Sequence, residues 1–85
     1  EIVMEINEIL RYAPQEGDII MHKDGSYHVI KEELSRGRMT VKANWHVLGS
    51  EPSEVDLNIP KLRTSMIQGN QFLVRKTEDE DIEMD

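Results

Sequence analysis

The apolar residues of this chain follow two spacings, one typical of a helix and the other typical of β-strands. Near the start they recur at intervals of three and four positions, which predicts an amphipathic helix. These residues are Ile2, Val3, Ile6, Ile9 and Leu10. Pro14 disfavours helical backbone at the residue before it, so the helix is predicted to end near Tyr12. A helix about 15 Å long is not stable alone in water, so its apolar face is expected to cover the rest of the fold.

Alternation of apolar and polar residues predicts strands in the remainder of the chain. The clearest alternation covers residues 39–47, and its apolar face is expected to be buried. That face consists of Met39, Val41, Ala43, Trp45 and Val47. The other predicted strands are residues 18–22, 27–34, 55–59 and 71–76, the last with Phe72 and Val74 on one face and Phe72 in the core. Residues 61–67 fit either a helical turn or a strand, and Pro60 is expected to end the strand before them.

One short N-terminal helix followed by about five antiparallel strands predicts a mainly β fold of the α+β class. Tight turns between the strands favour a meander that curls into a small barrel. This order of elements is similar to that of SH3-like and Sm-like barrels, and more loosely to that of OB-folds, which host many functions. A chain of 85 residues is at most one domain, so residues 1–77 are predicted to form it.

Charge is unevenly divided along the chain. The formal net charge is −7, and residues 78–85 carry six acids and no base. A dense run of like charges stays solvated, so residues 78–85 are predicted to form a disordered acidic tail. A solubilising end is the simpler interpretation of this tail, and a contact with a protein partner is the alternative. The candidate partner-binding residues are Glu78, Asp79, Glu80, Asp81, Glu83 and Asp85.

Nucleic-acid binding has modest support from the middle of the chain. Residues 20–76 contain nine bases and six acids, a small positive excess for a domain that binds by neutralising phosphates. The candidate nucleic-acid-binding residues are Lys23, Arg36, Arg38, Lys42, Arg63, Arg75 and Lys76. Tyr27, Trp45 and Phe72 are aromatic residues on which bases could stack, although Trp45 and Phe72 are expected in the core.

Three histidines, His22, His28 and His46, raise the question of a metal site. The length of the first hairpin turn determines whether His22 and His28 lie on the same face of the sheet. If Asp24 and Gly25 alone form the turn, His22 pairs with Tyr27, and His22 and His28 point to opposite faces. If residues 23–25 form a three-residue turn with a glycine bulge, His22 pairs with Ser26 and shares a face with His28. Only the second arrangement could bring both to one ion, with His46 or a carboxylate as third ligand. We predict no metal site and no cofactor.

No catalytic motif stands out. There is no cysteine, no nucleophile-elbow pattern surrounds a serine, and the glycines are spaced as turn residues. The longest apolar runs are far shorter than a membrane span. We therefore expect a non-enzymatic small binding module that acts through a cytoplasmic protein partner, of the inhibitor or accessory type known from phages and mobile elements. The alternative is a nucleic-acid-binding small barrel whose affinity is tempered by its acidic tail.

Overall fold

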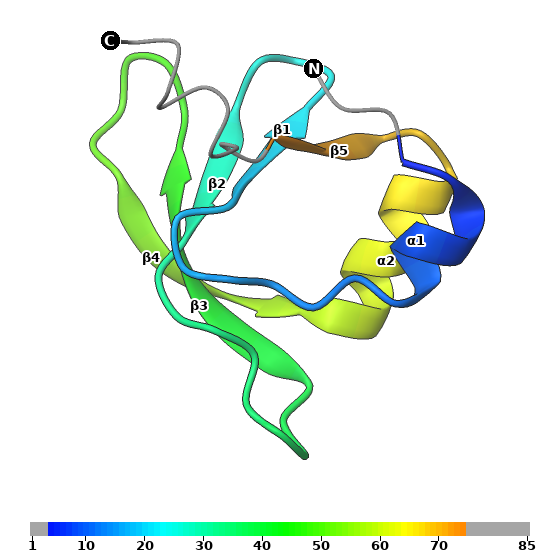
Figure 1. Ribbon diagram of the computed structural model, residues 1–85. Helices are drawn as coiled ribbons and strands as arrows, with labels where there is room; N and C mark the ends of the chain where they lie inside the picture. The colour runs from blue at the N-terminus through cyan, green and yellow to red at the C-terminus, as the bar shows by residue number, and fades with distance from the viewer. Residues whose placement is uncertain (1–3, 75–85) are drawn as a thin grey trace, which may run out of the picture.

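The computed structural model describes residues 4–74, which form five strands and two helices (Figure 1). The elements in chain order are α1 (Ile6–Leu10), β1 (Ile19–His22), β2 (Tyr27–Ile30), β3 (Thr40–His46), β4 (Ser53–Asn58), α2 (Ile59–Ile67) and β5 (Gln71–Val74). The predicted mainly β class is therefore confirmed, and each predicted strand has a counterpart. In the described part of the chain, neither helix has the length and apolar character needed to cross a membrane.

The five strands make one antiparallel sheet in the order β4-β3-β2-β1-β5. Neighbours in sequence are neighbours in the sheet, except that β5 returns to pair with β1. Figure 1 shows that the sheet curves strongly and that α1 and α2 lie together beside its open side. Within residues 4–74 no pairing joins the edge strands β4 and β5 to each other, so the described sheet is a curled meander rather than a closed barrel.

The core lies on the concave face of the sheet, which both helices cover. Alternate strand residues point into it, as the alternating sequence pattern requires. The buried strand residues are Ile20, Ile30, Val41, Ala43 and Leu73, and those from the helices and the segment after α1 are Ile9, Tyr12, Ile59, Leu62 and Met66. The register shows why they meet, because Ile20 is paired on one side with His28 and on the other with Leu73.

The segment that the sequence left ambiguous is helix α2. Asn58 caps its N-terminus by accepting a hydrogen bond from the Lys61 N–H over 3.0 Å. Pro60 lies in the first turn of α2, where its missing N–H breaks no helical hydrogen bond. It therefore favours the start of the helix directly after β4 ends. Leu62 and Met66 lie on one face of the helix, which is the face that enters the core.

Helix α1 is shorter than predicted, and its apolar face is mostly not buried. Ile9 is buried, but Ile6 and Leu10 are 59% and 53% exposed. Ile2 and Val3 lie outside the described residues. Tyr12, just after the helix, enters the core instead, and its hydroxyl donates a hydrogen bond of 2.8 Å to Asp18 Oδ2. A five-residue helix has little more than one turn, and only about one side chain per turn can face the neighbouring element. The predicted apolar face was therefore wider than the face that is buried.

The ends of the strands also correct the predicted core. Met39 and Val47, predicted to be buried at the two ends of one face, are exposed, because β3 is covered only along Val41 and Ala43. Trp45, predicted to be buried, is partly exposed near the end of β3. Phe72 and Val74 do share a face, but it is the outer face, since Leu73 is the β5 residue on the core side. Strand β2 ends at Ile30 rather than at residue 34.

Candidate functional site

The β1–β2 hairpin decides which side chains gather at one end of the sheet. Its turn has three residues, 23–25, because the His22 N–H donates to the Ser26 carbonyl oxygen over 2.8 Å. Gly25 has a φ of +94°, a left-handed conformation that such a turn needs and that glycine adopts without strain. Of the two turns left open by the sequence, the three-residue turn with a glycine bulge is therefore present. His22 and His28 consequently share the concave face.

Asp24 is held in this turn by its own side chain. Its Oδ1 accepts a hydrogen bond of 2.9 Å from the Ser26 N–H and a second one from the Ser26 hydroxyl. These bonds, the hydroxyl bond foremost, lower the pKa of Asp24 below its usual value. The tip of the hairpin therefore carries a fixed carboxylate that stays ionised at neutral pH.

Two imidazoles and the indole of Trp45 form a cluster on the concave face. The His28 ring stacks on Trp45 with 4.2 Å between centroids, and the His22 ring lies 5.1 Å from His28 and 4.8 Å from Trp45. His28 is buried, and its Nδ1 has no hydrogen-bond partner within residues 4–74. Burial, and to a lesser degree the neighbouring His22, lower the pKa of His28 to about 4. His28 is therefore neutral at pH 7.

The three histidines do not converge on one point. His46 lies on the outer face, opposite Tyr27, so it cannot join the other two. His22 contacts the side chain of Gln71 instead, with 2.9 Å between its Nε2 and the Gln71 Nε2. Across the described residues, no three His, Cys, Asp or Glu side chains are grouped so that they could hold a metal ion.

On the outer face, the same end of the sheet brings aromatic rings next to exposed apolar side chains. The rings of Tyr27 and His46 stack with 4.7 Å between centroids and 6° between planes. They lie beside the β3–β4 loop, in which Leu48 is fully exposed (102%) and Val47 is 39% exposed. We refer to Tyr27, His46, Val47 and Leu48 as the loop-end surface. It surrounds a shallow hollow of about 490 Å³ lined by residues 24–27 and 46–49.

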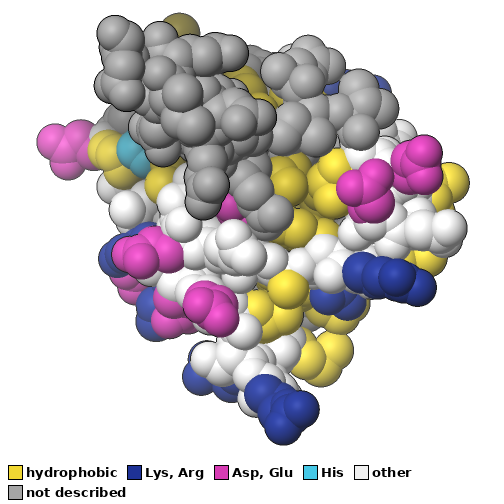
Figure 2. Space-filling model, in the orientation of Figure 1, with side chains coloured by type: hydrophobic (Ala, Val, Ile, Leu, Met, Phe, Trp, Pro, Cys, Tyr) yellow, Lys and Arg dark blue, Asp and Glu magenta, His cyan; other side chains and the backbone are white. Residues whose placement is uncertain are grey.

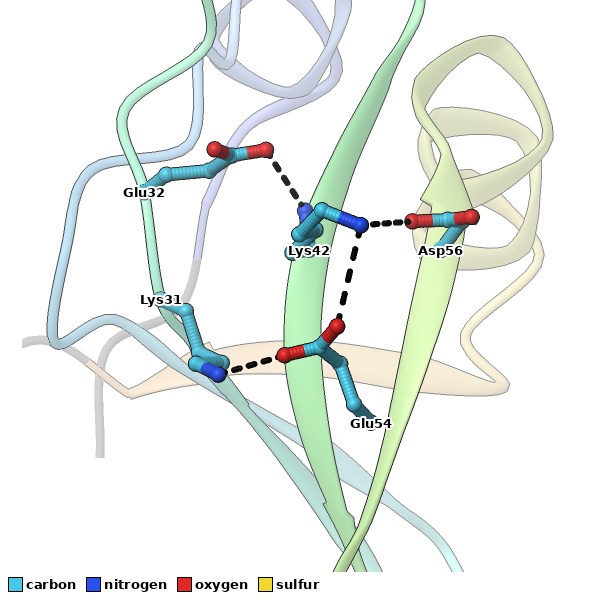
Figure 3. Close-up of polar contacts among 5 residues, drawn as sticks. All are labelled: Lys31, Glu32, Lys42, Glu54 and Asp56. Carbon is cyan, nitrogen blue, oxygen red and sulfur yellow. Dashed lines mark hydrogen bonds and ion pairs between the residues drawn. The ribbon is translucent and has the colours of Figure 1, made fainter.

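Further along the outer face, a network of charged side chains connects the segment after β2 with β3 and β4 (Figure 3). Lys42 Nζ lies 3.6 Å from a carboxylate oxygen of Glu54 and 3.6 Å from one of Asp56, and Lys31 pairs with the other oxygen of Glu54. Glu32 accepts a hydrogen bond of 3.1 Å from the Lys42 N–H. The bond from Lys31 is the main reason that the pKa of Glu54 is lowered. Lys42 therefore lies between two carboxylates, although exposed pairs of this kind contribute little to stability.

Two of the predicted nucleic-acid-binding residues have other contacts. Lys42 belongs to the charged network just described. The Arg63 guanidinium donates from Nε and Nη2 to the Tyr12 carbonyl oxygen over 3.1 and 2.7 Å. Arg63 therefore ties α2 to the segment that follows α1, and its position serves the fold.

The remaining basic candidates are not brought together. Lys23 lies in the β1–β2 turn, whereas Arg36 and Arg38 lie in the β2–β3 loop at the opposite end of the sheet (Figure 1). Figure 2 shows basic side chains dispersed over the visible face rather than collected in a patch. Arg75 and Lys76 lie outside the described residues, as do all six acids of the predicted partner-binding tail. Among the described candidates, the loop that carries Arg36 and Arg38 therefore lies apart from the turn that carries Lys23.

Sequence reasoning missed the loop-end surface. The alternation of β3 predicts Val47 in the core, and no periodic pattern marks Leu48. The sequence indicates Tyr27 as a ring on which bases could stack, but not its contact with His46. An apolar pair, Val47-Leu48, directly before a Gly49-Ser50 turn was the available signal, since a turn leaves its flanking side chains little to pack against.

Comparison of the chain with protein-family models, with curated proteins and with solved structures found no match. What the protein does is therefore inferred from its own residues.

Proposed function

We propose that the chain is a non-enzymatic binding module that acts through a protein partner in the cytoplasm, and that the loop-end surface is its contact. The observation that supports this proposal is the complete exposure of Leu48 beside Val47 and the stacked rings of Tyr27 and His46. Apolar side chains gathered on a surface and bordered by polar ones are typical of protein interaction sites. Leu48 packs against nothing in the core, so the fold itself gives no reason for a leucine there.

We further propose that the curled sheet, although not closed within residues 4–74, acts as a rigid scaffold of the SH3-like or Sm-like barrel kind. In support, β1 pairs with both β2 and β5, and α2 contacts both edge strands, β4 and β5. A stiff sheet of this kind would hold the β1–β2 turn and the β3–β4 loop in fixed positions. Such preorganisation limits the entropy lost on binding, which suits a small inhibitor or accessory protein.

A cross-linking experiment tests the contact surface. A photoreactive amino acid at position 48 should trap the partner from a host lysate, and the same residue at position 10 on α1 should not. With the partner identified, Leu48→Glu should weaken the complex by about tenfold or more, as expected for a central apolar contact. Leu10→Glu is the matched control, because Leu10 is also an exposed leucine. A complex whose affinity is the same with Leu48→Glu as with Leu10→Glu would contradict the proposal.

Nucleic-acid binding is the alternative function, and Arg36 and Arg38 in the β2–β3 loop are what favours it. Neither makes a described ion pair. Titration with random-sequence DNA and RNA at two salt concentrations would reveal such binding by its salt dependence. Removal of residues 78–85 should then tighten binding at low salt. If removal of these residues abolishes a protein complex instead, the acidic residues are the partner contact.

A further inference from the structure

The hollow at the loop-end surface combines one negative charge with a flat aromatic wall. The carboxylate is that of Asp24, a lining residue whose Oδ1 accepts both bonds from Ser26. The aromatic side is formed by Tyr27 and His46, both only partly buried, whose rings stack on each other so that each ring keeps one face free. No lysine or arginine is among the residues that line the hollow, and Lys23, the next residue in the turn, is not one of them. Asp24 is therefore the charged acid of a lining that contains no lysine or arginine.

These features match one side chain better than others. A guanidinium group is planar, stacks on aromatic rings and can donate hydrogen bonds in its plane to a carboxylate at the same time. Its aliphatic stem can lie along apolar residues, here Val47 and Leu48. An ammonium group can meet the carboxylate but cannot also stack as a plane, and a phosphate would be repelled by Asp24.

We propose that this hollow binds an arginine side chain presented by the partner protein, with the guanidinium stacked on the free face of the Tyr27 or the His46 ring and paired with Asp24. The inference rests on the proposed function, since it specifies the partner of the same surface. The Asp24 carboxylate in the lining favours a partner that is basic at its contact, because opposite charge speeds encounter.

The test uses the full chain labelled with ¹⁵N and two short peptides, acetyl-Gly-Arg-Gly-amide and its citrulline analogue. Citrulline has nearly the shape of arginine but no charge. Asp24→Asn removes the charge while its amide oxygen can still accept the bonds from Ser26. Asp56→Asn is the matched control, because it makes the same change of net charge on β4, away from the hollow.

The arginine peptide should shift the amide signals of residues 24–27 and 46–49 in a saturable way, and the citrulline peptide should bind at least about fivefold more weakly. Asp24→Asn should remove this difference, and Asp56→Asn should retain it. Equal binding of the two peptides, equal effects of the two variants, or no shifts at these residues would overturn the inference. If it is overturned while Leu48→Glu still breaks the partner complex, the proposed function stands and only the arginine assignment fails.

Discussion

The buried imidazole of His28 should make the protein lose stability as the pH falls from 7 to 5. In the folded chain the His28 ring is stacked on Trp45 and faces His22, and its pKa is about 4. In the unfolded chain the same group has a pKa near its ordinary value of 6.5. Because the folded pKa is the lower one, the unfolded state takes up the proton first. Stability is therefore fully present above pH 6.5 and falls as the pH drops from 6.5 toward 4.

The size of this effect follows from the separation of the two pKa values. The excess of protons that the unfolded chain binds at His28 rises from about 0.2 at pH 7 to about 0.9 at pH 5, which lowers the free energy of unfolding by about 2 kcal/mol over this range. For a small domain this is a large part of a stability of about 5 kcal/mol or somewhat more. Burial also lowers the pKa of His22, opposed by the charge of Asp24, so His22 adds a contribution of the same sign.

Urea denaturation followed by circular dichroism at a series of pH values measures the loss. His28→Phe keeps a ring against Trp45 but cannot be protonated, so the fall between pH 7 and pH 5 should be smaller by about 2 kcal/mol. His46→Phe makes the same change on the outer face and should keep the full fall. Carboxylates with lowered pKa, such as Glu54, act at lower pH and leave this window clear. An equal fall for His28→Phe and for the unsubstituted protein would refute the reasoning.

Two further predictions concern the turn and the segment before β1. Tyr12→Phe removes the hydroxyl that donates to the buried Asp18 carboxylate, and it should lower the free energy of unfolding by about 1–3 kcal/mol in urea denaturation; an unchanged midpoint would show that this bond does not matter. Gly25→Ala places a Cβ on backbone with a φ of +94° and should cost about 1 kcal/mol of stability, seen as a lower melting temperature. Gly25→Asn, which tolerates this conformation better, should cost less, and the opposite order would contradict the assignment.

The strands could be predicted because the pattern that specifies them is local. Val41 and Ala43 alternate with polar neighbours, and one side of a half-buried strand requires this spacing. The ends of the strands could not be predicted in the same way. Met39 and Val47 continue the alternation, yet they are exposed, since burial at a strand end depends on whether another element covers it. The buried part of β3 is therefore shorter than the alternating pattern predicts.

The two helices show which signals were available and which were not. Asn58 and Pro60 are a start signal for α2, and Leu62 and Met66 are spaced as on a helix face, so α2 could have been read from the sequence. The hydrogen bond between Tyr12 and Asp18 could not have been predicted from the sequence, because it depends on how the segment after α1 folds back onto β1. In the candidate site, the sequence predicts a turn near residues 23–25. It does not predict whether that turn has two or three residues.

The length of that turn links the core of the protein to the proposed binding surface. With three residues in the turn, Ile20 pairs with His28 and shares the core face with it, while Tyr27 and Met21 share the outer face. With two residues, His22 would pair with Tyr27, and every side chain of β1 would change its face relative to β2. The turn that Gly25 permits therefore fixes both which residues β1 contributes to the core and which one, Met21, pairs with Tyr27 on the outer face. Burial of Ile20 in turn stabilises the one register in which Asp24 lies at the rim of the hollow.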